Sequence, residues 1–313
     1  MYFKRYDATQ AETWNAFVAQ AKNGLFMFNR KFMDYHSDRF TDHSLMAYDD
    51  TGALIALLPA NQRDGTLYSH QGLTFGGFVT GTKLKAANML ELMHLLQAYL
   101  QQNGLSKAIY KTIPHIYHAH PAQEDVYALF RTGAQIIRVD ITTTVNLSDP
   151  LPFSELRRRG SKKAAKQGVT VQQSHNFAGF ISMLAGVLAE RHDTKPVHSL
   201  AEIELLASRF PDNIKLFTAE AAGEILAGTL IFEYPHMAHA QYIAASPAGR
   251  EIGALDALFD TLIRNTYAHK AYFDFGISTE EAGTVLNEGL IHQKEGFGGR
   301  AVTHHVYELP AAR

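Results

Sequence analysis

The segment 272–300 contains the strongest candidates for acid–base and electrostatic chemistry in the sequence. Its 29 residues include six glycines, five acids and a single lysine. Asp274 follows an apolar strand pattern, and a carboxylate at a strand end can accept a proton from a reacting group. Lys294 lies among glycines, which let the backbone approach a ligand closely, and its ammonium could stabilise an oxygen that gains negative charge. We therefore expect a flexible, charged segment that wraps a reacting group and contributes little to a packed core.

Both candidates have simpler interpretations. Lys294 could be an ordinary surface lysine, and a proton could move through substrate or water with no dedicated base at Asp274. Ser278 and Glu281 fit a capping box, in which a serine and an acid three residues later bind each other's backbone N–H groups. Glu281 is therefore interpreted as a helix cap and not as a base.

The elements around this segment occur twice along the chain. The first copy is predicted as a helical region around 14–35, a hairpin over 45–60, a strand over 67–79, a helix over 88–104 and a strand over 107–113. The second copy is predicted as a helix over 201–210, a hairpin over 214–234, a strand over 239–246, a helix over 255–268 and a strand over 271–277. Ser199 and Glu202 form a capping box before the first helix of this second copy.

The repeat predicts two domains of ordinary size. Pro150 and Pro152 discourage regular structure between the two copies. We therefore expect one domain over 1–150 and a second over 151–313. The C-terminal strand of the second domain could return to the first.

The composition is that of an ordinary globular chain. It has 313 residues, of which 46% are hydrophobic and 19% charged, and its net charge of −2 gives no global attraction to nucleic acid or membrane. The absence of cysteine excludes disulfides, thiolate nucleophiles and cysteine metal ligands. No signal-peptide pattern and no apolar run of about 20 residues is present. We expect a cytoplasmic protein without a membrane span, whose oligomeric state the sequence does not determine.

The turn over 249–254 is a candidate phosphate-binding turn. The order of the elements resembles the GNAT acyltransferase fold, a mixed, mostly antiparallel sheet flanked by helices. The resemblance implies that this turn binds the phosphates of an acyl donor through backbone N–H groups. Arg250 and Gly253 match the family signature Gln/Arg-x-x-Gly-x-Gly/Ala, whereas Leu255 stands where a small residue belongs. A plain strand-to-helix turn is the alternative.

Three further stretches resemble the FemAB/FemX-like transferases, which are tandem GNAT-fold proteins. The first is Asp-Phe-Gly at 274–276 followed by Lys-Glu-Gly-Phe-Gly at 294–298. The others are the basic helix over 154–171 and the region 110–134, which is similar to the first-domain closing region of a GNAT-like branch associated with envelope polysaccharide or cell-wall synthesis. The resemblance covers nearly the whole chain. It implies an α/β (α+β) fold of two tandem GNAT-like domains, with the acceptor on the first and the donor on the second.

The resemblance also implies a reaction. Better-known members of the family move an amino acid from aminoacyl-tRNA to an amine of a peptidoglycan precursor. Lys294 matches the lysine of their Phe-Lys-x-x-Phe-Gly motif, near the reacting ester, whereas Gln293 replaces the first phenylalanine. The chain also has no room for the long coiled-coil hairpin that many aminoacyl-tRNA-dependent members carry. No tightly bound cofactor is expected, and acetyl-CoA or aminoacyl-tRNA would serve as the co-substrate.

Six cations fall within residues 157–166. At helical spacing they surround the helix, so a solvated helix is the usual interpretation. The alternative is a contact for a phosphate-bearing partner such as a nucleotide-linked acceptor, CoA or tRNA. Arg158 and Lys162 represent this cluster among the candidate substrate-binding residues.

The remaining candidates are polar residues expected near a groove between the domains. Alternation on the strand 239–246 predicts that His239 and Gln241 share one face and that Tyr242 lies on the other. By resemblance, Arg30 and Lys31 lie where the family binds acceptor phosphates. The other substrate-binding candidates are Tyr110, Lys111, His115, Tyr117 and Asn287.

Three histidines of the first domain are candidate metal ligands. His115, His118 and His120 are close enough in sequence to reach one zinc ion. A polar loop that lines the groove is the better interpretation, so no metal site is assigned. A second loop, around Lys195, is expected to cover the groove.

The sequence therefore predicts a FemAB-like acyl or aminoacyl transferase that forms an amide on an amine of a cell-envelope precursor, either a small molecule or a nucleotide-linked one. One alternative is an acetyl-CoA-dependent GNAT N-acetyltransferase that acts on an amino sugar. Another is a degenerate, non-catalytic member that binds a glycan precursor or a partner protein. The turn from Arg250 to Gly253 separates the first two. Backbone N–H groups that converge on an open pocket would favour CoA, and a blocked turn would favour tRNA.

Overall fold

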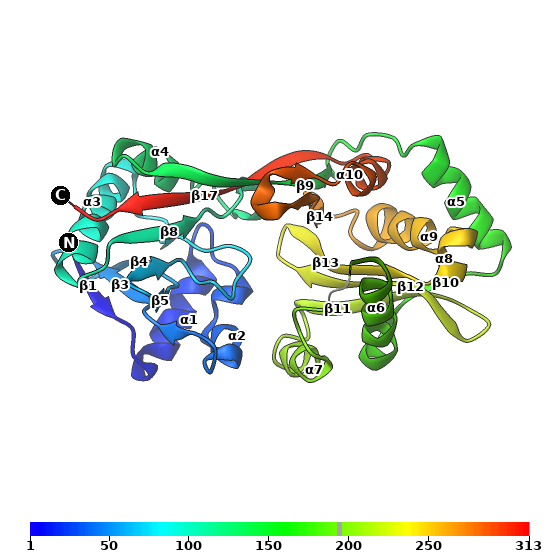
Figure 1. The fold of residues 1–313 in the computed structure, drawn as a ribbon, viewed down its shortest axis with the longest axis horizontal. Helices are drawn as coiled ribbons and strands as arrows, with labels where there is room; N and C mark the ends of the chain where they lie inside the picture. Colours follow the sequence, from blue (N-terminus) through cyan, green and yellow to red (C-terminus); the bar gives the residue numbers. More distant parts are fainter. Residues whose placement is uncertain (193–195, 313) are drawn as a thin grey trace. The chain divides into compact units, whose positions relative to one another are not determined.

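The computed structural model describes residues 1–192 and 196–312, and the chain divides into two compact units. Unit 1 is built from Met1–Asp140, Glu281–Val285 and the residues from Thr303 on. Unit 2 is built from Ile141–Glu280 and Leu286–Val302. Strands β9 (Gln135–Asn146) and β17 (Arg300–Pro310) have residues in both units (Figure 1).

Unit 1 contains two groups of strands. One group has the order β1 (Tyr2–Arg5), β3 (Leu45–Tyr48), β4 (Leu54–Leu58) and β7 (Val79–Thr80), with antiparallel pairing throughout. The other has the order β17, β8 (Lys107–Lys111), β6 (Thr66–Tyr68), β5 (Asn61–Arg63) and β2 (Thr41–Asp42). The helices are α1 (Ala11–Gln20), α2 (Arg30–Met33), α3 (Ala86–Gln102) and α4 (Glu124–Arg131).

The core of unit 1 forms around α3. Leu92, Leu96 and Leu100 recur at a spacing of four residues, which places them on one face of the helix. That face packs into the apolar cluster formed with Leu45 of β3 and Leu309 of β17. The predicted helix therefore forms because its apolar face has a sheet to bury against.

The strand predicted over 67–79 is interrupted. Only its ends form strands, as β6 and β7. Between them His70 has φ +60° and Gly77 has φ +75°, and neither conformation is compatible with an extended strand. The intervening residues form a loop because of these two turns.

Unit 2 is organised around one mixed sheet. Its strands have the order β10 (Thr170–Ser174), β11 (Ile214–Ala221), β12 (Glu224–Glu233), β13 (Met237–Ala245), β14 (Tyr272–Ile277) and β9. Only the pair β13–β14 is parallel in this series. The helices are α5 (Glu155–Lys166), α6 (Phe177–His192), α7 (Leu200–Arg209), α8 (Pro247–Ile252), α9 (Ala254–Thr261) and α10 (Glu288–Glu295).

Helices cover both faces of this sheet (Figure 1). Ala227 of β12 belongs to the apolar cluster that contains Leu258 of α9. The next residue, Gly228, faces the opposite side, where a Cβ atom would lie 2.6 Å from the Phe180 ring of α6. This glycine lets α6 pack directly on the sheet. The predicted fold class, mixed sheets flanked by helices, is confirmed.

The expectation for segment 272–300 is wrong in one respect. The segment is not a flexible tail that lacks a core, because Phe273, Phe275 and Phe297 are buried in the main apolar cluster of unit 2. The predicted cap at Glu281 is also wrong. Glu281 has φ +46° in a turn, and the Ser278 hydroxyl accepts a hydrogen bond from Lys294 instead.

Candidate functional site

Strands β13 and β14 separate in the middle of the sheet of unit 2. Their parallel pairing is confined to residues 237–239 of β13 and 272–274 of β14, ending with the pair His239 and Asp274. Beyond this pair β13 continues to Ala245. Gly276 has φ +74°, which allows β14 to turn away at this point. The separation leaves the edge of β13 beyond His239 without a strand partner on the β14 side.

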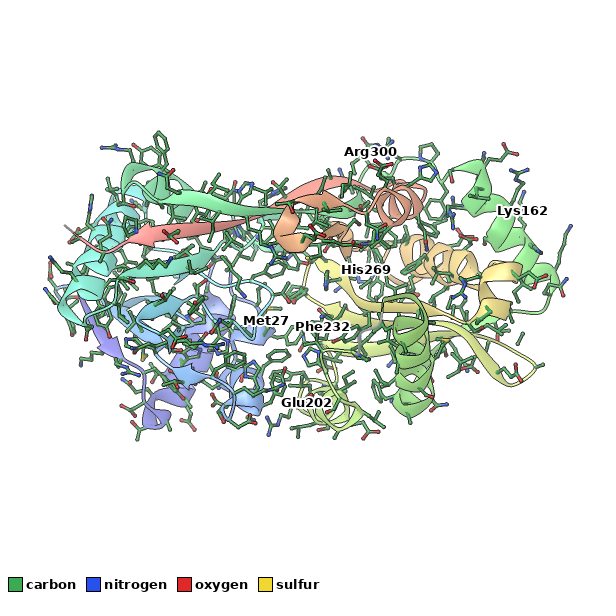
Figure 2. The ribbon with its side chains drawn as sticks, in the orientation of Figure 1. Met27, Lys162, Glu202, Phe232, His269 and Arg300 are labelled. Atoms are coloured by element: carbon green, nitrogen blue, oxygen red, sulfur yellow. The ribbon has the colours of Figure 1, made fainter. Side chains whose placement is uncertain are left out.

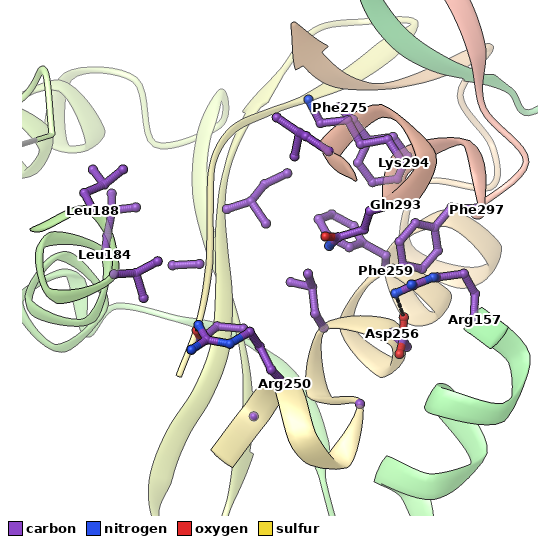
Figure 3. Close-up of a pocket in the computed structure, with 18 residues that line it drawn as sticks. Arg157, Leu184, Leu188, Arg250, Asp256, Phe259, Phe275, Gln293, Lys294 and Phe297 are labelled. Atoms are coloured by element: carbon purple, nitrogen blue, oxygen red, sulfur yellow. Dashed lines mark hydrogen bonds and ion pairs between the residues drawn. The ribbon is translucent and has the colours of Figure 1, made fainter. Parts of the chain in front are cut away.

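A cavity of about 450 Å³ adjoins this separation. Residues 243–245 of β13 and Phe275 of β14 border it, and α6 supplies an apolar wall of Leu184, Val187 and Leu188. Helices α9 and α10 supply the opposite wall, which includes Phe259 (Figure 3). The cavity therefore offers a largely apolar space next to unpaired backbone of β13, which suits the reactive end of an acyl group.

Asp274 is fully buried beside this separation. Its Oδ1 accepts hydrogen bonds from the hydroxyls of Thr142 and Thr144, the second at 2.9 Å. Its Oδ2 lies 2.7 Å from His239 Nδ1 and accepts the N–H of Gly276 at 3.3 Å. A buried carboxylate is stable only with such partners. Because the carboxylate is inaccessible, any part it takes in proton transfer runs through His239.

Lys294 is also buried, with 5% of its surface exposed. Its ammonium donates to the carbonyl oxygens of Gly276 at 2.9 Å and Ile277 at 2.7 Å, and to Ser278 Oγ at 2.9 Å. Burial lowers the pKa of Lys294 from 10.5 to about 8, and the nearby Asp274 carboxylate partly opposes this effect. The three contacts use all three N–H donors, so Lys294 fixes the end of β14 and borders the cavity with its stem.

The turn predicted to bind phosphates spans the end of α8, Gly253 and the first residue of α9. The N–H of Gly249 donates to Ser246 Oγ, the N–H of Arg250 to the Ser246 carbonyl, and the N–H of Gly253 to the Gly249 carbonyl. These groups therefore do not converge on the cavity, although Gly249, Arg250 and Gly253 line it. The Arg250 guanidinium donates to the Ala245 carbonyl at 2.8 Å.

Gly253 has a packing role in this arrangement. It has φ +84°, and a Cβ atom there would lie 2.5 Å from the carbonyl oxygen of Gly160 in α5. The close approach of α5 and α9 therefore requires glycine at this position. On the same helix pair, Arg157 forms an ion pair with Asp256 at 2.7 Å, so this cation points inward.

Arg158 and Lys162 remain on the exposed side of α5, and Figure 2 shows Lys162 directed away from the ribbon. The predicted basic helix therefore has one arginine, Arg157, directed toward α9, and exposed cations, such as Arg158 and Lys162, directed toward solvent. The structure places these outward cations and the cavity in the same unit.

The predicted alternation on β13 is wrong because the strand contains a bulge. Leu230 pairs with Tyr242, but Ile231 pairs with Ala240, which leaves Gln241 as the extra residue. His239 and Tyr242 therefore share a face. The Tyr242 hydroxyl lies 2.6 Å from His198 Nδ1, and burial raises the pKa of Tyr242 to about 12. The Oε1 of Gln241 is buried and has no hydrogen-bond partner within the described chain.

Asn287 has a local role at the start of α10. Its Oδ1 accepts the N–H of Leu290 at 2.9 Å, and its amide donates to Glu280 at 2.7 Å. It therefore caps the helix that carries Lys294. Lys195, at the centre of the predicted covering loop, lies outside the described residues.

The other candidates lie in unit 1. Tyr110 is buried, and its hydroxyl donates to Asp125 at 2.9 Å and accepts the N–H of Phe78 at 2.7 Å. Lys111 donates to the carbonyl oxygens of His70, at 2.9 Å, and Leu73, and burial lowers its pKa to about 8. These polar groups serve the interior of unit 1, so we do not carry them into the proposed site.

Three further substrate-binding candidates lie in unit 1. Tyr117 is buried, whereas His115 and Lys31 are exposed. Arg30 is buried and binds Asp34 and Asp42 at 2.6 and 2.7 Å, so its charge is used within the unit and not on a phosphate.

Across residues 1–192 and 196–312, no group of three His, Asp or Glu side chains is arranged to hold a metal ion. The helices of these ranges include none with the length and apolar character needed to cross a bilayer.

Two features of the site are not predicted from the sequence: the α6 wall of the cavity and the contact between Asp274 and His239. The apolar run over 177–189 could have indicated the helix α6, but no helix is predicted there. No sequence pattern indicates the contact between Asp274 and His239, because 35 positions separate the two residues.

The matches to known proteins agree with this geometry. A family model described as an acetyltransferase (GNAT) domain matches residues 155–282. The structure of FemX is similar over 99% of this chain and 97% of its own, with a TM-score of 0.67 and 12% identity. The structure of L-PGS from Bacillus licheniformis is similar over 99% of this chain and 94% of its own, with a TM-score of 0.62 and 15% identity.

A tandem GNAT protein from the clavulanic acid biosynthesis pathway is also similar, over 99% of this chain and 98% of its own, with a TM-score of 0.51 and 12% identity. No curated protein sequence matches the chain. The chain thus has a FemX-like tandem fold and carries a GNAT domain, and together these support an acyltransferase.

Proposed function

We propose that this protein transfers an acyl or aminoacyl group from an activated donor to an amine, forming an amide, with the reactive end of the donor in the cavity of unit 2. The observation that carries the proposal is the cavity beside the separated strands β13 and β14. An acyl carbonyl placed there would meet backbone of β13 that has no strand partner beyond His239. Backbone N–H groups aimed at a developing oxyanion are among the strongest single contributions to catalysis, at about 3–4 kcal/mol.

The reaction forms one C–N bond and breaks the C–O or C–S bond of the donor. The attacking amine must lose a proton, and the His239–Asp274 pair, joined at 2.7 Å beside the separated strands, is the proposed acceptor. Lys294 would act as a positioning residue that holds the Gly276–Ser278 segment against the cavity. Holding the two reactants together can supply roughly 7–11 kcal/mol of the barrier reduction.

The acceptor is proposed from the family resemblance as an amine of a cell-envelope precursor. Lys31 and His115 are exposed in unit 1 and stay predictions for acceptor binding. The outward cations of α5, represented by Arg158 and Lys162, could contact phosphates of either substrate. The N–H groups of Gly249, Arg250 and Gly253 are already used within the protein, which weakens the case for a CoA pyrophosphate at these groups and leaves aminoacyl-tRNA as a candidate donor.

A second candidate function is acetyl-CoA-dependent N-acetylation of an amino sugar. The match of residues 155–282 to an acetyltransferase domain favours it. So does the position of Arg250 at the rim of the cavity, where a cation could contact a donor phosphate.

A transfer assay with paired donors tests both functions. The protein is incubated with acetyl-CoA or with an aminoacylated tRNA, each with a panel of nucleotide-linked amino sugars and peptidoglycan-precursor peptides, and amide products are detected by mass spectrometry. A product with the aminoacyl donor supports the first function, and a product with acetyl-CoA supports the second. If no donor yields a product and none raises the midpoint of thermal unfolding, the proposal fails.

A further inference from the structure

Gln293 has a distinct position in the cavity of unit 2. Among the side chains that line this cavity in the described part of the chain, it is the only neutral polar one. It lies on α10 directly before Lys294 and is half-buried. Figure 3 shows its amide directed into the space that Leu184 and Leu188 face from α6.

The charged groups that line the same cavity are already engaged within the protein. Arg157 is paired with Asp256 at 2.7 Å, and Arg250 donates to the Ala245 carbonyl at 2.8 Å. Lys294 uses its three donors on the end of β14. Although the two guanidiniums keep further N–H donors, each of the three groups already has a partner within the protein.

The amide of Gln293 differs in this respect. Within residues 1–192 and 196–312, no hydrogen bond joins the Gln293 amide to another side chain or backbone group. An amide that faces apolar walls without a partner is unfavourable once a ligand has expelled the water around it. A ligand that supplies a matching donor and acceptor would remove this cost.

We propose that Gln293 is a specificity-determining residue that hydrogen-bonds an amide or amine group of the donor close to its reactive carbonyl. This inference rests on the proposed function. Two donors carry that chemistry. The pantetheine arm of an acyl-CoA contains amides, and an aminoacyl ester contains an α-amine. The carbonyl and the N–H of the glutamine side chain can serve either group.

The apolar environment makes this contact selective. Where a site is built to hydrogen-bond a group, an analogue that lacks the group leaves the protein amide unpaired and binds less well. Gln293 would therefore favour a donor with a polar group at this distance over a simple alkyl acyl group.

The test compares Gln293→Leu with His292→Ala. Leucine keeps a side chain of similar size without the amide, and His292 is exposed on the same helix and does not line this cavity. Binding of acetyl-CoA and of a CCA-ended RNA minihelix with a stable aminoacyl-amide terminus is measured by calorimetry. Donor KM and kcat are measured for the donor that yields product.

We expect Gln293→Leu to raise Kd and KM about tenfold for one of the two donors, which corresponds to ~1.4 kcal/mol, with kcat unchanged. The affected donor identifies the source of the polar group. His292→Ala should match the wild type. Equal binding by Gln293→Leu and wild type, for a donor that the wild type binds, would overturn this inference and leave the proposed function intact. A wild type that binds neither probe would overturn both.

Discussion

Removal of the buried ammonium of Lys294 should change stability in a way that depends on pH. Burial lowers the pKa of Lys294 from 10.5 to about 8. Between these pH values the unfolded chain keeps the proton that the folded chain has lost, so the free energy of unfolding rises with pH. Below pH 8 both states are protonated, and the cost of burying the charge is constant. A pKa change of this size corresponds to roughly 3 kcal/mol.

Lys294→Met removes this contribution. The free energy of unfolding of the wild type minus that of the variant should therefore increase by roughly 3 kcal/mol between pH 7 and pH 10.5. Urea denaturation at several pH values in this range measures the difference, in which the titrations of other groups cancel. Lys162→Met, on the exposed side of α5, should show no such trend. A difference that stays constant or shrinks as pH rises would contradict the lowered pKa of Lys294, because it would mean that the carbonyl contacts stabilise the ammonium more than burial destabilises it.

Two further substitutions test the contacts that shape the site. Asp274→Asn should lower the free energy of unfolding by about 2–4 kcal/mol in urea denaturation, because an amide nitrogen would face hydroxyl and N–H donors in a buried position. An unchanged midpoint would contradict the assigned contacts. Arg157→Met should lower the free energy of unfolding by about 3 kcal/mol, because the 8%-exposed Asp256 would lose its ion-pair partner. Arg158→Met, one residue along the same helix, is the control and should unfold like the wild type.

Local sequence patterns predicted the parts of the fold that local contacts determine. The hairpin over 45–60 forms as β3 and β4, with its turn at Gly52. The Ser199–Glu202 capping box forms as predicted, with the two residues binding each other's backbone N–H groups. Such features depend on a few neighbouring residues, so the sequence is sufficient to predict them.

The site depends on contacts that no local pattern specifies. The bulge at Gln241 changes which side chains of β13 share a face, and it results from the register against β12. The partner of Asp274 is set by the pairing of β13 with β14, so its spacing in sequence carries no information. The family motif identified Lys294 as important. It did not predict that the ammonium would be directed to the carbonyl oxygens at the end of β14.

In the proposed function, an acyl donor places its reactive end in the cavity between α6 and the separated strands of unit 2. Val187→Trp fills this cavity from the α6 wall, so the affinity of this variant for acetyl-CoA and for the aminoacyl minihelix tests that placement. Ala189→Trp places the same side chain on an exposed position of α6 that does not line the cavity. We expect the first variant to lose at least tenfold in affinity for the donor that the wild type binds, and the second to bind normally. Wild-type affinity in Val187→Trp would show that the donor does not bind in this cavity.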